Sequence, residues 1–178
     1  GFMLGPLSAD WSVLPWDRFL VWAWTSVRLG GMTALLALGV AWLLAFSLRR
    51  HPTLPRRGAV QLISLGYAVP GAVVVVGLLL PVGWLQARWP DSGAGAVVTA
   101  TVLGLLWAYL VRFVSVALQS VQSGYARVSR SLDESARLLG ASGLELALRV
   151  HWPLLRRAGL AAALLVFVDV MKELPATI

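Results

Sequence analysis

Three charged side chains near the end of the sequence are the residues best placed to act on a polar substrate. Asp169, Lys172 and Glu173 interrupt an otherwise apolar run, and their i, i+3 and i, i+4 spacing puts them on one face of a helix. Because a charge within an apolar helix is costly unless it faces a cavity or a partner, they are candidates for the polar lining of a translocation path. The alternatives are an ion cluster that only holds helices together, and a position at the outer interface of the lipid bilayer.

Groups suited to catalysis or metal binding are scarce. The sequence has no cysteine, and its two histidines, His51 and His151, have no partner at metal-ligand spacing. Lys172 is the only lysine and Glu173 follows it, so the phosphate-binding loop Gly-x-x-x-x-Gly-Lys-Ser/Thr is absent. No nucleophile and base are arranged as in hydrolases. We therefore predict no catalytic residue, metal site or cofactor, and any energy from ATP would have to come from another subunit.

The composition is that of a membrane protein. Of the 178 residues, 58% are hydrophobic and only 13% are charged, compared with about 25% charged residues in soluble domains. Four apolar stretches have the length of about 20 residues that a helix needs to cross a bilayer. They run from about Phe19 to Leu48, Leu62 to Leu85, Ala94 to Leu118, and Ala158 to the end. We therefore predict an all-α fold, a polytopic transmembrane helical bundle with four spans.

Two regions are expected along the chain. Residues 1–18 would form an outer interfacial segment, and residues 19–178 the transmembrane domain. Within the second span, Pro70 and Gly71 predict a helix kink, because proline removes a backbone donor and clashes with the preceding turn. The chain begins with glycine rather than methionine and stops soon after an apolar run, so we expect a fragment that lacks both ends of its protein.

Basic residues set the expected orientation in the lipid bilayer. Arginines cluster in segments 49–57 and 119–157, whereas segment 86–93 holds only one, Arg88. Since basic residues stay on the cytoplasmic side, the two arginine-rich segments should lie inside and the third outside. We expect Arg112 to extend to the headgroups. The net charge of +7 thus reflects topology, not nucleic-acid binding. An outer aromatic belt agrees with this orientation: Trp11, Trp16, Trp22, Trp24, Trp84 and Trp89.

The polar interval 119–157 carries two signals for the start of a helix. Ser131 and Glu134 have the Ser-x-x-Glu spacing of a capping box, and Ser142 and Glu145 repeat it. Gly140, between the two, suits the left-handed position that ends a helix. We expect a helix–glycine–helix element that is either a docking lever for a partner or an interfacial helix pair lying on the headgroups.

The same interval resembles the EAA loop of bacterial ABC-importer permeases. That pattern is Glu-Ala-Ala, three residues, Gly, nine residues, an aliphatic residue, two residues and Pro. Two positions depart from it, because Ser135 replaces the first alanine and Trp152 stands where leucine is usual. The resemblance implies that Glu134, Ala136 and Gly140 lie in a groove of the ATPase subunit. The residues at the defined positions of the pattern are Glu134, Ser135, Ala136, Gly140, Val150 and Pro153, and the last of these suits the first turn of the next helix.

Two further stretches resemble ferric-iron-type permeases, and with them the resemblance covers about residues 24–178. They are Gly-Tyr-Ala-Val-Pro-Gly at 66–71 and Lys-Glu-Leu-Pro-Ala-Thr at 172–177. The resemblance implies an ATP-driven importer of ferric iron in the bacterial inner membrane. Its partners would be a cytoplasmic ATP-binding subunit, a periplasmic substrate-binding protein, and a second permease half or copy. The alternatives are a permease for thiamine, sulfate or polyamines, an ATP-independent secondary transporter or channel, and a structural membrane scaffold.

Overall fold

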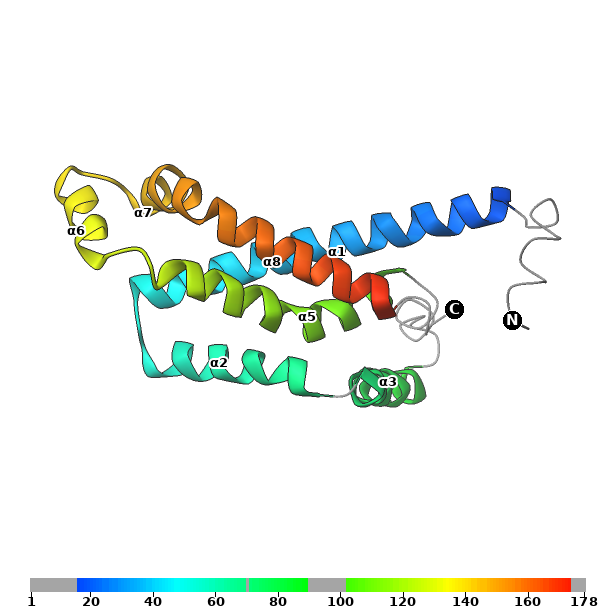
Figure 1. Ribbon diagram of the computed structural model, residues 1–178. Coiled ribbons are helices and arrows are strands. Elements are labelled where there is room, and N and C mark those ends of the chain that lie inside the picture. Colours follow the sequence, from blue (N-terminus) through cyan, green and yellow to red (C-terminus); the bar gives the residue numbers. More distant parts are fainter. Residues whose placement is uncertain (1–15, 70, 90–101, 174–178) are drawn as a thin grey trace, which may run out of the picture.

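Three long helices form the body of the molecule. The computed structural model describes residues 16–69, 71–89 and 102–173, and these are helical apart from short connections. Helices α1, α5 and α8 pack against one another along their lengths (Figure 1). Their bounds are Trp16–Arg50 for α1, Val102–Tyr125 for α5 and Trp152–Glu173 for α8. The prediction of an all-α fold is therefore confirmed.

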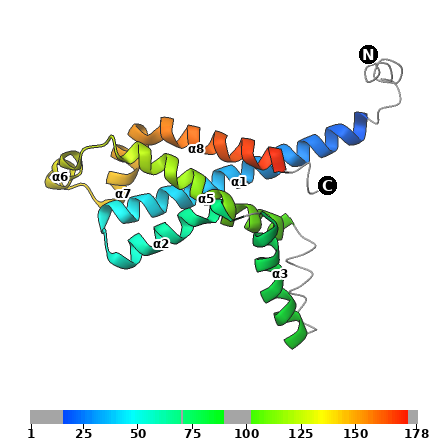
Figure 2. The ribbon, with the colours of Figure 1, turned by 60° about the horizontal axis from the view of Figure 1, so that its bottom comes forward.

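Shorter helices occupy the two ends of this body. Helix α2 (Leu54–Ser64) packs on α1 and α5, and α3 (Gly71–Arg88) projects steeply away from the other helices (Figure 2). At the opposite end from α3, helices α6 (Arg130–Leu138) and α7 (Gly143–Glu145) lie near the connection between α1 and α2 (Figure 1). The two arginine-rich segments of the sequence therefore meet at one end of the molecule.

Two helices in the described ranges are long and apolar enough to cross a membrane. They are Arg18–Arg50 and Gly104–Tyr125. The prediction of four spans is therefore wrong for the part of the chain that the structure describes. The third predicted span corresponds to α5 from residue 102 onward. Its first residues, 94–101, lie outside the described ranges.

The second predicted span, Leu62 to Leu85, is not one helix. Helix α2 ends at Ser64, a 3₁₀ turn follows at Leu65–Ala68, and α3 begins at Gly71. The turn is pressed against α5, since a Cβ on Gly66 would lie 2.8 Å from the carbonyl oxygen of Val111. Only a residue without a side chain allows this approach of two backbones. Pro70, predicted at a kink, lies outside the described residues.

The fourth predicted span is interrupted by charge. Arg156 and Arg157 lie in the first turns of α8, and Asp169 and Lys172 lie near its other end. The uncharged stretch between the arginines and Asp169 has eleven residues, which is about 16 Å of helix at 1.5 Å per residue. A hydrocarbon core is about 30 Å thick. The apolar part of α8 is therefore too short to span a bilayer by itself.

Helix α1 buries mostly small residues and exposes large ones. Its buried side includes Ala34, Ala37, Ala41 and Ala45, whereas Leu35 and Leu43 on the same helix are exposed. A helix in the core of a water-soluble protein has the opposite pattern, because burying large apolar side chains drives its packing. Small residues at helix contacts, with an apolar outer face, are typical of helices that pack within a membrane.

Gly124 of α5 packs closely against α8, and we expect Gly124→Ala to destabilise the fold. A Cβ there would lie 2.7 Å from Ala158 Cβ and 3.0 Å from Leu155 Cδ2, and the alanine methyl cannot rotate away. The resulting overpacking costs about 1–3 kcal/mol. The thermal midpoint of the purified full-length protein in detergent measures the effect.

Gly39→Ala is the matched control for this substitution. No atom lies within 4 Å of a Cβ on Gly39, so this change should be neutral or should stabilise α1 by about 0.5–1 kcal/mol. Equal midpoints for the two variants would show that α5 and α8 do not pack as described.

Candidate functional site

The most distinctive local geometry is the turn between α6 and α7, which together form the α6–α7 hairpin (residues 130–145). Gly140 has a φ angle of +87°. The N–H of Ala141 donates to the carbonyl of Ala136 at 3.0 Å, and the N–H of Gly140 donates to the carbonyl of Arg137 at 2.9 Å. These two bonds with a left-handed glycine make a Schellman motif. The prediction that Gly140 ends a helix is confirmed.

One of the two predicted capping boxes is present. The N–H of Ser142 donates to Glu145 Oε2 at 2.9 Å, and the N–H of Glu145 donates to Ser142 Oγ at 3.2 Å. The bond from the Ser142 backbone keeps the pKa of Glu145 below its usual value, because it favours the carboxylate form. The start of α7 is therefore fixed by its own sequence.

The other predicted capping box, Ser131 with Glu134, is wrong. Helix α6 already begins at Arg130 with Ser129 as its N-cap, so Ser131 lies inside the first turn. Its hydroxyl donates to the hydroxyl of Ser129 at 3.1 Å instead. The cause is tertiary: Arg49 binds the carbonyl oxygens of Val128 and Ser129, which fixes the chain just before the helix.

Pro153 lies in the first turn of α8, as predicted, and the chain before it is also helical. A π-helical stretch, Leu146–His151, which includes Val150, follows α7 directly and runs into α8 at Trp152. Proline lacks an N–H, and its ring crowds the carbonyl four residues earlier. The wider π turn immediately before Pro153 accommodates both effects, so α7, the π-helical stretch and α8 follow one another without a non-helical residue between them.

A buried polar cluster attaches the α6–α7 hairpin to the long helices. We call it the Arg49 cluster, and its members are Arg49 of α1, Tyr125 of α5, Asp133 of α6 and His151 of the π-helical stretch. Arg49 Nε donates to Asp133 Oδ2 at 2.7 Å, and Arg49 Nη2 donates to Asp133 Oδ1 at 3.2 Å. Both side chains are 11% exposed. Such a forked, charge-assisted pair fixes the orientation of both groups.

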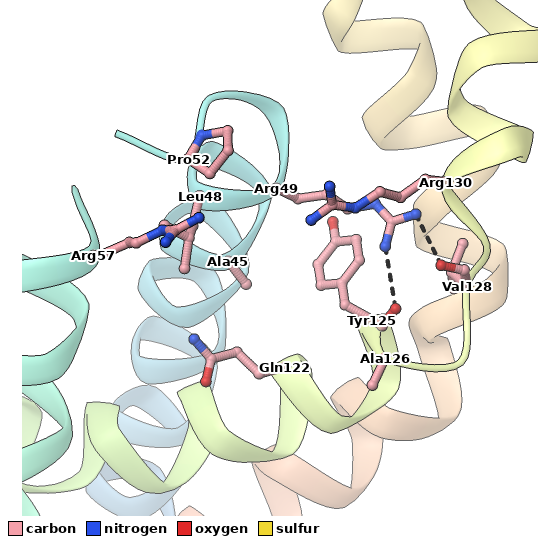
Figure 3. A pocket seen from close by; sticks show the side chains of 10 residues that line it. All are labelled: Ala45, Leu48, Arg49, Pro52, Arg57, Gln122, Tyr125, Ala126, Val128 and Arg130. Atoms are coloured by element: carbon pink, nitrogen blue, oxygen red, sulfur yellow. Dashed lines mark hydrogen bonds between the residues drawn. The ribbon is translucent and has the colours of Figure 1, made fainter. Parts of the chain in front are cut away.

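The remaining donors of Arg49 bind the chain that leads into α6. Nη1 donates to the carbonyl of Tyr125 at 3.1 Å, and Nη2 donates to that of Val128 at 2.9 Å (Figure 3). Nη2 also donates to the carbonyl of Ser129 at 2.9 Å. The guanidinium also lies 5.2 Å from the centre of the Tyr125 ring. One side chain of α1 therefore holds the end of α5, the connection and α6 together.

His151 completes the cluster from the side of α8. Its ring is fully buried, with Nε2 2.9 Å from Asp133 Oδ1 and Nδ1 3.2 Å from the Tyr125 hydroxyl. In the neutral imidazole, the N–H at Nε2 donates to the carboxylate, and Nδ1 accepts from the hydroxyl. Asp133 thus joins α6 both to α1 and to the π-helical stretch that leads into α8.

Aromatic side chains pack around the His151 ring of this cluster. Phe46 and Tyr125 both make edge contacts with the His151 ring, at 5.6 and 5.2 Å between centroids. Trp42 stacks on Phe46 at 6.2 Å and meets Trp152 edge-on at 6.0 Å. Trp152, the departure from the EAA pattern, therefore contributes to the wall around the cluster. The low local polarity strengthens each hydrogen bond inside it.

The charge state of Asp133 follows from its partners. Burial alone would raise the pKa of this carboxyl, but the hydrogen bonds from Arg49 and His151 outweigh burial and bring the pKa below its usual value. Asp133 is therefore ionised at neutral pH and forms a true ion pair with Arg49. Its side chain lies on the side of α6 that faces the long helices.

The outer side of the α6–α7 hairpin is apolar and exposed. Leu138 and Leu139 are 88% and 87% exposed, and Leu144 is also exposed. Glu134 and Ser135 are exposed as well, whereas Ala136 is partly covered. The structure thus gathers most of the predicted loop residues on one projecting element, with apolar side chains at its tip. Unpartnered apolar tips of this kind mark a contact surface.

The charges near the end of α8 form two pairs. Arg112 Nη2 of α5 lies 2.6 Å from Glu173 Oε1, so Arg112 does not extend to the headgroups as predicted. Arg112 is partly buried between the helices, and a carboxylate within reach satisfies it better than a distant headgroup. Lys172 Nζ lies 3.7 Å from Asp169 Oδ1 and is largely exposed. Asp169, Lys172 and Glu173 lie in the last turns of α8, at the opposite end of that helix from His151.

Sequence reasoning assigned no role to Arg49, Tyr125, Asp133 or His151. One signal was available: Asp133 is an acid on an arginine-rich helix, directly before Glu134. Comparison with models of protein families, with curated proteins and with solved structures finds no match for this chain. The function proposed below therefore depends on the geometry of the chain and on its sequence patterns.

Proposed function

We propose that this chain is a membrane-spanning permease subunit of an ATP-driven importer, and that the α6–α7 hairpin is its contact with a separate ATP-hydrolysing subunit. The observation that carries the proposal is a helix–glycine–helix hairpin that presents exposed leucines while a buried ion pair holds it to the apolar helices. The EAA-like spacing of Glu134, Gly140 and Pro153 within this element agrees with that role.

The position of the hairpin favours a docking lever over a helix pair lying on lipid. In both views α6 lies beyond the end of α1 and α5 (Figures 1 and 2). Asp133 of α6 pairs with α1 while Leu138 and Leu139 are exposed, whereas an interfacial helix would turn its apolar face toward the bilayer. Anchoring through Arg49 and Asp133 also gives the hairpin a fixed direction, which a groove in a partner requires.

Transport by this subunit would use substrate delivered by a periplasmic binding protein, with a second permease half or copy completing the pore. Ferric iron is the substrate that the short stretches at 66–71 and 172–177 favour. The ion pair between Arg112 and Glu173 lies between α5 and α8. It is a candidate for the polar lining of the path, together with Asp169 and Lys172.

Two leucines at the tip provide the experiment. The double variant Leu138→Asp, Leu139→Asp should insert normally, because both side chains are almost fully exposed. It should fail to co-purify with the ATP-hydrolysing subunit, because two carboxylates would have to be desolvated in the contact. We expect retention of that subunit, measured on affinity-purified protein, to fall at least about tenfold.

Leu54→Asp is the matched control. Leu54 begins α2 at the same end of the molecule and is also highly exposed, but it lies outside the hairpin. This variant should keep its partner. Undiminished retention by the double variant would contradict the proposed contact, as would equal loss in the control.

A further inference from the structure

A basic pocket opens at the same end of the molecule as the α6–α7 hairpin, whose first residue, Arg130, is among its lining residues. It has a volume of about 470 Å³ and lies between the last turns of α1 and α5 and the beginning of α2 (Figure 3). Three of its lining residues are arginines, Arg49, Arg57 and Arg130, and a fourth polar side chain is Gln122. No carboxylate is among the residues that line it.

Two of the three arginines are electrostatically unbalanced. Arg49 is neutralised by Asp133 and donates to backbone carbonyls. Arg57 and Arg130 are exposed, and their side chains make no hydrogen bond or ion pair with any other residue in the described ranges. Both guanidinium groups line one cavity, and a bound anion would supply the counter-charge that they lack.

Most of the other lining residues are apolar and lie at or just beyond the ends of the candidate membrane spans. Ala45 and Leu48 come from the last turns of the span at Arg18–Arg50, and Ala126 follows directly after the span at Gly104–Tyr125. The floor of the pocket therefore lies where the apolar helices end, and its arginine rim lies beyond them. A ligand that fits both parts carries an anionic group next to an apolar body.

We propose that this pocket binds the phosphate of an anionic phospholipid headgroup. Guanidinium forks match phosphate oxygens in a bidentate manner, and basic pockets between membrane helices on the cytoplasmic side recognise acidic headgroups. A free phosphate ion shares the charge but would leave the apolar floor uncovered. The site does not depend on the proposed importer function, since it requires only that the two apolar helices lie in a bilayer.

The test compares lipids with the same acyl chains on the purified full-length protein. Native mass spectrometry would measure retention of phosphatidylglycerol and of phosphatidylcholine. We expect phosphatidylglycerol to be favoured, and the double variant Arg57→Gln, Arg130→Gln to lose at least about tenfold of that preference. The variant Arg57→Lys, Arg130→Lys keeps both charges and should retain most of the preference. A loss seen only in the glutamine variant would then come from the missing charges and not from misfolding.

The double variant Arg18→Gln, Arg88→Gln removes the same charge from exposed arginines elsewhere on the molecule and should bind lipid like the unsubstituted protein. Equal binding of the two lipids, or an undiminished preference in the Arg57→Gln, Arg130→Gln variant, would overturn the site. Displacement of phosphatidylglycerol by millimolar inorganic phosphate would show a free-anion site and overturn the lipid assignment.

Discussion

Asp133→Asn is expected to destabilise the protein by about 3 kcal/mol, the lower part of the range for removing one partner of a buried ion pair. Asparagine keeps the shape of the side chain, but it leaves the Arg49 guanidinium without its counter-charge in a site walled by aromatic rings. The carbonyl acceptors of Arg49 remain, which limits the loss. Denaturant unfolding of the full-length protein in detergent would measure it.

Glu134→Gln is the control for the stability effect, because it removes the same charge one residue further along. Glu134 is exposed and pairs with no residue in the described part of the chain, so its loss should change the free energy of unfolding by less than about 0.5 kcal/mol. Amide exchange should also become faster in residues 130–139 of the Asp133→Asn variant alone. Equal stability of the two variants would mean that the Arg49 cluster does not hold the hairpin.

Gly140→Val should leave a protein that inserts into the membrane but neither retains its ATP-hydrolysing subunit nor transports. The φ angle of +87° costs an L-residue about 1–2 kcal/mol, and a β-branched residue more. No atom lies within 4 Å of a Cβ at this position, so the effect comes from the backbone and not from a clash. We expect the angle between α6 and α7 to change. The measured results are loss of co-purification with the ATP-hydrolysing subunit and loss of substrate uptake.

Gly140→Asn separates backbone strain from loss of the glycine itself. Asparagine tolerates the left-handed conformation and is the usual substitute at this helix end. The asparagine variant should therefore keep most of its partner and its uptake. Full retention and normal uptake in the valine variant would show that the Schellman turn is not needed for coupling.

Local signals in the sequence predicted local structure well. Gly140 and the capping box of Ser142 with Glu145 appear as expected, because each depends on residues no more than five apart. The start of α6 was predicted incorrectly, although Ser131 and Glu134 have the right spacing. There the contact of Arg49 with the preceding carbonyls outweighs the local preference.

Long-range contacts explain what the sequence did not reveal. Arg49 and Asp133 are 84 residues apart, and no periodicity within either helix indicates that they meet. Arg112 was expected at the headgroups because only its own helix was considered, and Glu173 comes from another. The predicted second span failed for a similar reason, since Gly66 suits a turn only because the backbone of α5 passes beside it.

Contact between the α6–α7 hairpin and a separate ATP-hydrolysing subunit can be tested most directly by cross-linking in cells. The sequence has no cysteine, so Leu139→Cys provides a single thiol at the exposed tip, and Arg88→Cys provides one at the end of α3. A short thiol-to-amine cross-linker should join Cys at position 139, and not at position 88, to a protein that carries a phosphate-binding loop. Absence of that product from the tip, or its equal formation from both positions, would contradict the proposed coupling role.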